Sequence, residues 1–192
     1  MQLAPSQLQI LLEIARDTIR AALCGTFPQP IPQDPVLHQP AGCFVSLHEL
    51  RSHRLRGCVG RLDARGALAP TVVAMAKGVL EDPRFLNYPV QFTDLPNLDI
   101  ELSILSPLMP AANPLDFEPL EEGIYLTHGD RSGCFLPQVA RETRWSKEQL
   151  LDRLCTEKLG MPAHTWKHPG SRLQKFTVVL IGPEPFLGRS LL

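Results

Sequence analysis

The chain has 192 residues, 44% of them hydrophobic and 20% charged, and it carries a formal net charge of −1. This length and composition allow a substantial buried core and exclude a disordered or coiled-coil protein. Because the net charge is close to zero, no overall field favours nucleic acid or an anionic membrane as a partner. No stretch has the pattern of a membrane span or a signal segment, so we expect a cytoplasmic protein.

Cysteine usage points away from disulfides and metals. The five cysteines are an odd number at irregular spacings, and none forms a C-x-x-C pair. This pattern favours reduced thiols and indicates no zinc site. The sequence also lacks a Walker loop, a G-x-G-x-x-G motif and the clustered cysteines of an iron–sulfur radical enzyme. We therefore expect no metal and no cofactor.

The first predicted element is a long helix. Ser6 is expected as its N-cap with Gln9 as the capping-box partner, and Gly25 is expected to end it. The next segment, 27–40, carries five prolines, which remove backbone donors and favour extended geometry. We predict a long surface loop here, with a flexible lid as the alternative.

A hairpin, a helix and a strand are predicted next. Two extended runs around a polar turn within 43–62 predict the hairpin. Apolar residues on one face and a tolerated early proline predict a helix over 69–80. Strict alternation over 98–104 predicts a half-buried strand. Its apolar side is Leu98, Ile100, Leu102 and Ile104, and its polar side is Asp99, Glu101 and Ser103.

The second half of the chain repeats much of this order. A second hairpin is predicted within 123–139, after another proline-rich loop. Ser146 and Gln149 form a capping box for a second helix, and Gly160 ends that helix. The last strand is predicted over 174–182.

Two segments, 43–80 and 124–160, echo one another. Each has the order strand, polar turn with an Arg-Ser pair, Gly-Cys and helix. The echo indicates a duplicated unit of sheet and helix, with coincidence as the alternative. Strands that come as hairpins predict an α+β fold with a largely antiparallel sheet.

The segment "LRGCVGRL", 55–62, is the main candidate site. In a regular strand, alternate residues point to opposite faces, although a bulge at either glycine would reverse this. Cys58 would then share a face with arginines, which favour its thiolate form, while the glycines let a ligand approach the backbone. The alternative is a small residue filling a tight corner. The two faces would be Leu55, Gly57 and Val59 against Arg54, Arg56, Cys58 and Gly60.

Charged residues near this segment suggest partners for the thiol. Five arginines fall within 51–65, and they either form a solvated strand edge or bind a phosphate or carboxylate. Glu101 lies on the polar side of the predicted strand. It is a candidate general base, or it forms a structural ion pair with an arginine such as Arg56. His53, like Arg56 and Arg61, would favour the thiolate form of Cys58, and His128 in a predicted turn is a weak candidate for a base to a cysteine.

Five motifs occur in order along the chain: "LRGCVGRL", "EDPRF", "LDIELSILSPL", "GCFLPQVARETRW" and "LCTEKLGMPAHTW". On these motifs the sequence resembles the AMMECR domain family, whose microbial members are also called AmmeMemoRadiSam system protein A. The resemblance covers about 6–185, leaving 1–5 and 186–192 as terminal tails. It implies a single compact α+β domain with a barrel-like, mostly antiparallel sheet, flanking helices and two related halves.

The resemblance also implies site residues and partners. Its signature carries over to residues 55–60, 82–85 and 136–139 and to Glu101 and Ser103. Family members often have an aliphatic residue at Cys134, which implies packing there, and Glu184 is the one candidate for the acidic residue that usually closes the last strand. The implied partners are a Memo-type protein and a radical S-adenosylmethionine enzyme. The predicted catalytic residues are Cys58, as a nucleophile or redox thiol, and Glu101. The residues predicted to bind the substrate are Arg56, Gly57, Gly60, Arg84 and Gln138.

Two functions remain open at the level of sequence. The first is an enzyme, or a component of an enzyme system, that binds a small anionic substrate beside Cys58. The second is a non-catalytic interaction module in which the R-G-C-V-G motif is structural and the proline-rich loops dock a partner.

Overall fold

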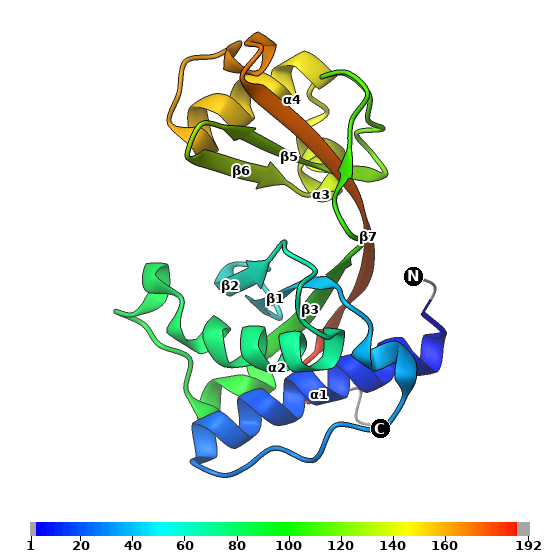
Figure 1. The fold of residues 1–192 in the computed structure, drawn as a ribbon. Helices are drawn as coiled ribbons and strands as arrows, with labels where there is room; N and C mark the ends of the chain where they lie inside the picture. Colours follow the sequence, from blue (N-terminus) through cyan, green and yellow to red (C-terminus); the bar gives the residue numbers. More distant parts are fainter. Residues whose placement is uncertain (1–2, 188–192) are drawn as a thin grey trace. The chain divides into compact units, whose positions relative to one another are not determined.

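The computed structural model describes residues 3–187, which form two compact units (Figure 1). Unit 1 combines the chain up to Leu105 with the chain from Val179 onward, and unit 2 is Ser106–Val178. One long strand, β7 (Ser171–Pro185), contributes its first half to unit 2 and its second half to unit 1. The prediction of an α+β fold with a mostly antiparallel sheet and flanking helices is confirmed.

Unit 1 is a sheet with the strand order β2-β1-β3-β7, covered on one face by α1 and α2 (Figure 1). Both predicted strands of its hairpin, the following helix and the alternating strand are present. Its elements are α1 (Pro5–Cys24), η1 (Pro35–His38), β1 (Gly42–Glu49), β2 (Leu55–Arg61), α2 (Leu68–Gly78), η2 (Val79–Glu81), η3 (Pro83–Phe85), η4 (Phe92–Asn97) and β3 (Leu98–Leu105), followed by the second half of β7.

Strand parity decides which side of this sheet forms the core. Val45 of β1 lies opposite Leu102 of β3, and Leu47 lies opposite Ile100, and all four side chains are fully buried. They pack with α1 and α2 in one apolar cluster. Because alternate residues point to opposite faces, the remaining residues of β1 and β3 form the second face of the sheet.

The start of α1 differs from the prediction. The helix begins at Pro5 with Ala4 as N-cap, so Ser6 lies inside the first turn, and the Gln7 side chain accepts the Ala4 N–H. The proline explains the shift, because its fixed φ and missing N–H suit the first helical position. Gly25 ends the helix as predicted, with φ of 66° in the left-handed region.

A buried arginine joins α1 to the last part of β7. Arg16 is 3% exposed, and its Nη2 donates to the Pro185 carbonyl at 2.8 Å and lies 3.2 Å from the Glu184 carboxylate. Its Nη1 pairs with Glu13. Phe186, which the sequence placed in a terminal tail, is fully buried and donates its N–H to a β3 carbonyl. Of the two predicted tails, residues 1–2 and 188–192 lie outside the described part.

Unit 2 is built from a second hairpin and the first half of β7, with β5 between β6 and β7. The capping box of Ser146 and Gln149 and the helix end at Gly160 are confirmed. The helix α3 was not predicted; it follows the second hairpin directly, with Pro137 at its first position. The elements are β4 (Met109–Pro110), β5 (Glu122–His128), β6 (Arg131–Phe135), α3 (Pro137–Thr143), α4 (Lys147–Arg153), η5 (Leu154–Leu159) and η6 (Thr165–Lys167).

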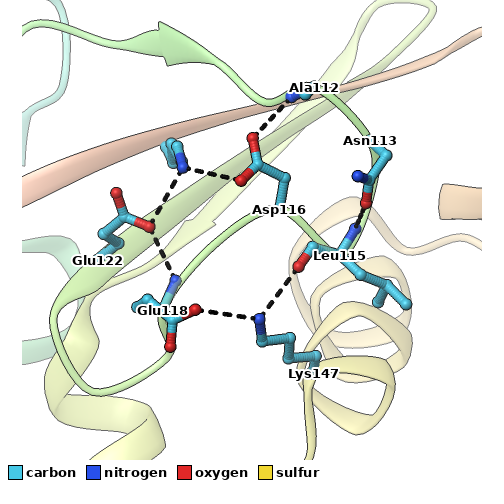
Figure 2. A network of polar contacts seen from close by, with 8 residues as sticks. Ala112, Asn113, Leu115, Asp116, Glu118, Glu122 and Lys147 are labelled. Atoms are coloured by element: carbon cyan, nitrogen blue, oxygen red, sulfur yellow. Dashed lines mark hydrogen bonds and ion pairs between the residues drawn. The ribbon is translucent and has the colours of Figure 1, made fainter.

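A network of polar contacts fixes the proline-rich loop of unit 2 (Figure 2). Asp116 accepts hydrogen bonds from the Ala112 N–H at 2.8 Å and from Lys175 at 3.1 Å. Lys175 also lies 3.5 Å from Glu122, which accepts the N–H of Glu118 at 2.8 Å. The Ala112 N–H and Lys175 lower the pKa of Asp116, so the carboxylate stays charged and the loop is held against β7.

Among residues 3–187, no helix combines the length and the apolar character that a membrane crossing requires.

Candidate functional site

The register of β1 places three residues in one row across the sheet of unit 1. Ser46 lies opposite Cys58 of β2 and opposite Glu101 of β3. Paired residues of neighbouring strands point to the same face, so these side chains are direct neighbours. They lie on the second face of the sheet, because Val45 and Leu47 of the same strand face the core.

The neighbouring residue pairs continue this face of the sheet in both directions. On one side His48 lies opposite Asp99, and on the other side Phe44 lies opposite Gly60 and Ser103. Ser46, Asp99 and Ser103 are buried, whereas the other members of the row are half-buried. We call the set the Cys58 face: Phe44, Ser46, His48, Cys58, Gly60, Asp99, Glu101 and Ser103.

Asp82 and Arg84 of the "EDPRF" motif hold the backbone of Cys58 from the open edge of β2. The Cys58 N–H donates to Asp82 Oδ2 at 2.9 Å, and Arg84 Nη2 donates to the Cys58 carbonyl at 3.0 Å. Arg84 also binds both oxygens of Asp82, at 3.0 Å through Nε and at 2.7 Å through Nη2. The pair therefore satisfies the two backbone groups that β1 does not reach.

These hydrogen bonds keep Asp82 charged although its side chain is buried. Arg84, followed by the backbone N–H groups of Cys58 and Arg84, lowers the pKa of Asp82 to about 2, against the opposing effect of burial. Asp82 in turn raises the pKa of Arg84. Within the described residues, Arg84 Nη1 makes no hydrogen bond, and the side chain is 57% exposed. Asp82 compensates the charge of the Arg84 guanidinium, so what Arg84 can still offer beside Cys58 is a hydrogen bond from Nη1.

The two glycines of the motif are required by close packing on opposite faces. A Cβ at Gly57 would lie 2.7 Å from the Val79 carbonyl oxygen, because the end of α2 packs directly on the strand. A Cβ at Gly60 would meet the ring of Phe44, which covers that position. Both glycines are thus explained by packing within unit 1, beside any effect on ligand access.

Arg56 lies at a β-bulge, where the regular alternation of faces along β2 is interrupted. The register of β1 and β2 shifts between Leu47 and His48, and Arg56 is the extra residue of the bulge. The strict alternation that would place Arg56 and Cys58 on one face therefore does not hold here. Its guanidinium is 16% exposed and pairs with Asp94 at 3.6 Å and Glu49 at 3.9 Å. It lines a cavity of about 360 Å³ with both carboxylates, which disfavours an anion there.

His48 is the residue of this face that the sequence reasoning did not select. Burial lowers its pKa, and the opposing charge of Asp99 offsets this only in part. The side chain is therefore neutral at pH 7 and able to accept a proton. The signal was available, because Ser46 and His48 alternate with the apolar residues of the run "CFVSLHEL". His53 lies at the edge, 4.0 Å from Asp99, and is 75% exposed.

The remaining predicted residues fall elsewhere. Gln138 lies in the first turn of α3 in unit 2, and Cys134 lies on β6 of the same unit. His128 of unit 2 contacts the Ser171 hydroxyl at 2.8 Å. Burial raises the pKa of Cys43, which packs in the core of unit 1. No cluster of three His, Cys, Asp or Glu that could hold a metal occurs between residues 3 and 187.

Comparison with known proteins identifies the family of this chain. The model of the AMMECR1 family matches residues 12–181. The chain belongs to the AMMECR1 family. The match includes both motifs that meet at Cys58, namely the strand β2 and the segment with Asp82 and Arg84.

Its relatives in the AMMECR1 family include archaeal proteins of similar length. A protein of Thermoplasma volcanium is 30% identical over 88% of this chain and 86% of its own. A protein of Thermococcus gammatolerans is 32% identical over 92% of this chain and 90% of its own. The crystal structure of an uncharacterized protein from Pyrococcus horikoshii has a TM-score of 0.78 at 30% identity, covering 88% of each chain. The fold described above is therefore that of a solved AMMECR1-type structure.

Proposed function

We propose that this AMMECR1 protein is an enzyme, or a component of an enzyme system, that uses the Cys58 thiol on a small anionic ligand. The observation that carries the proposal is the register that places Cys58, Ser46 and Glu101 in one row, with His48 and Asp99 in the next. A nucleophile, a neutral imidazole and carboxylates on one face of a sheet are the groups that covalent catalysis requires.

In this proposal the residues have different roles. His48, neutral at pH 7, accepts the thiol proton, and the buried Asp99 beside it stabilises the resulting imidazolium. Arg84, whose side chain is 57% exposed and whose charge Asp82 compensates, donates a hydrogen bond from Nη1 to the anionic group of the ligand. Glu101 positions the reacting group. Arg56, held by Glu49 and Asp94, supports the bulge beside Cys58 and takes no part in the binding.

Alkylation by iodoacetamide tests the activated thiol directly. We expect Cys58 to react about ten-fold faster than Cys134 at pH 6.5, since a neighbouring base promotes thiolate formation. His48→Asn should remove most of this advantage while leaving Cys134 unchanged. The measurement is peptide mass spectrometry over a time course. If Cys58 reacts no faster than a small-molecule thiol such as glutathione, the activated form of the proposal is wrong.

A second candidate is a non-catalytic interaction module in which Cys58 is structural. It is favoured by the Asp82–Arg84 contacts and by the tight packing at Gly57, which together would hold this corner for packing reasons alone. Cys58→Ser separates the two candidates. If the thiol acts chemically, the variant should change the free energy of unfolding by less than about 1 kcal/mol. The same variant should fail to restore function in a strain that lacks the gene. Outright unfolding of the variant would favour the structural corner.

We further propose that the protein acts together with a Memo-type protein and a radical S-adenosylmethionine enzyme. Membership in the AMMECR1 family supports this, because microbial proteins that this chain resembles are named for a system with those two partners. The test is to co-express the three proteins with an affinity tag on one of them, and to analyse the purified sample by size-exclusion chromatography. Co-elution that Arg84→Glu abolishes would support docking near the Cys58 face, whereas three separate peaks at micromolar concentration would contradict a stable complex.

A further inference from the structure

Unit 2 contains a cavity of about 680 Å³ that none of the predicted site residues lines. Its volume lies in the range of small-molecule sites. Two walls form it: the turn 118–121 at the end of the proline-rich loop, and the segment from the end of α3 to the start of α4. The lining residues are Glu118, Pro119, Leu120, Glu121, Ala140, Arg141, Arg144 and Trp145.

Two arginines of this cavity lack a carboxylate partner. Arg141 donates through Nε and Nη2 to the Leu120 carbonyl, which fixes its guanidinium without neutralising the charge. Arg144 has a left-handed backbone, with φ of 54° and ψ of 28°. Within residues 3–187, no Asp or Glu lies within 4.0 Å of either guanidinium. This conformation ends α3, where Arg144 is the C-cap and its N–H donates to the Ala140 carbonyl at 2.9 Å.

The opposite wall is fixed before any ligand arrives. Figure 2 shows that the loop leading to the turn is held at several points by the network around Asp116 and Glu122. Lys147 adds a hydrogen bond to the Leu115 carbonyl at 3.1 Å and an ion pair with Glu118 at 3.5 Å. The ion pair compensates the charge of Glu118, so among the described residues Glu121 is the one carboxylate of the lining without a cation within 4.0 Å. A wall fixed in this way reduces the entropy cost of binding.

We propose that this cavity binds a small organic carboxylate with an apolar body. Arg141 and Arg144 bind the carboxylate, because a guanidinium matches its two oxygens. Leu120, which is 59% exposed, and the half-buried indole of Trp145 contact the apolar body. A single negative charge is required, since Glu121 in the wall repels a dianionic phosphate more strongly. The site is independent of the chemistry proposed at Cys58.

Ligand-detected NMR titrations with three related probes test the proposal. The probes are 3-phenylpropanoate, its neutral analogue 3-phenylpropanol, and phenyl phosphate. We expect the carboxylate to bind at least ten-fold more tightly than the alcohol and more tightly than the phosphate. Equal affinity of acid and alcohol, or no binding at millimolar concentration, would overturn the proposal. Tighter binding of phenyl phosphate would overturn the assignment to a carboxylate.

Variants locate the binding in this cavity. Arg144→Gly removes the charge at a position whose backbone suits glycine, so folding is preserved, and affinity for 3-phenylpropanoate should fall about ten-fold without a change for the alcohol. Glu121→Gln removes the opposing charge and should increase affinity two- to three-fold. Arg172→Gln, the same loss of charge on β7 outside this cavity, is the matched control and should change nothing. Equal losses in Arg144→Gly and Arg172→Gln would show that binding depends only on net charge.

Discussion

The two β-hairpins of the protein share an architecture and differ at their cysteines. In unit 1 the row across the sheet is Cys58, Ser46 and Glu101. In unit 2 the corresponding row is Cys134, Tyr125 and Gln174. Each cysteine follows a glycine on an edge strand, and each glycine lies against the helical segment that follows its hairpin. The structure therefore agrees with the internal echo that the sequence contains.

The difference between the rows lies in the side chains that surround each cysteine, and it bears on the proposal that Cys58 is the reacting thiol. A serine beside Cys58 adds a hydroxyl, and Glu101 adds a carboxylate. A tyrosine beside Cys134 adds a large ring, and Gln174 carries no charge. The same fold thus presents one cysteine to polar, ionisable neighbours and the other to bulky, uncharged ones. This supports packing as the role of Cys134, as the family resemblance implied.

Among the substitutions that test this comparison, Asp82→Asn should have the largest effect on stability, because Asp82 binds the backbone of Cys58 directly. The variant replaces a buried carboxylate that binds the Cys58 N–H and Arg84, and we expect a loss of about 2 to 3 kcal/mol in unfolding free energy. Urea denaturation at pH 7 measures it. A loss below about 0.5 kcal/mol would show that the Asp82–Arg84 pair does not stabilise unit 1.

The same carboxylate predicts a pH dependence. The pKa of Asp82 is lowered from 3.8 to about 2 in the folded protein, so its stabilisation is complete above about pH 4 and is lost as the pH falls toward 2. The wild type should therefore lose about 2 kcal/mol more than Asp82→Asn between pH 5 and pH 2. Parallel stability curves for the two proteins would contradict the assignment.

Gly57→Ala and Gly133→Ala test whether the two hairpins pack alike. An added Cβ would lie 2.7 Å from the Val79 carbonyl in the first case and 2.4 Å from the Lys158 Cβ in the second. Each should cost about 1 to 3 kcal/mol by overpacking. The control is Gly66→Ala, whose Cβ would meet only the Thr71 hydroxyl at 3.1 Å, and it should be near neutral. A neutral Gly133→Ala would break the structural equivalence of the two units.

Limited alkylation with a larger reagent, N-ethylmaleimide, should leave the fold intact and sort all five cysteines. Cys43 and Cys155 are fully buried, and burial raises the pKa of each, so neither should react in the native protein. Cys24 is exposed and should react readily. Peptide mapping after a short exposure reports the order. Labelling of Cys43 before Cys58 would contradict the packing described for unit 1.

Most of the secondary structure could be read from the sequence, because its signals are local. The alternation in β3, the prolines of the loops and the capping box at Ser146 act over a few residues. The errors arose where two local signals competed or where a helix was short. Pro5 outweighed Ser6 at the start of α1, and α3 has seven residues, too few to show helical periodicity.

The candidate site was predicted less completely, because it depends on which residues become neighbours across strands. Cys58, Glu101 and Arg84 were selected from their motifs, and the structure gives Cys58 a row with Glu101 and a direct contact with Arg84. The bulge at Arg56 depends on the pairing of two strands, which one strand alone does not reveal. His48 was missed for the same reason, since its relation to Asp99 follows only from the register of β1 and β3.

The path of β7 determines which of the two units can fold first while the chain is being synthesised. Ile181 and Phe186 are buried in the core of unit 1, and they are translated after the whole of unit 2. The same holds for Glu184 and Pro185, the two partners of Arg16 on β7. Unit 2 is contiguous and can fold as soon as it leaves the ribosome, whereas unit 1 must wait with α1, β1, β2 and β3 already exposed. Long-range closure of this kind slows folding. We therefore expect the nascent first half of the protein to be the species that depends most on chaperones.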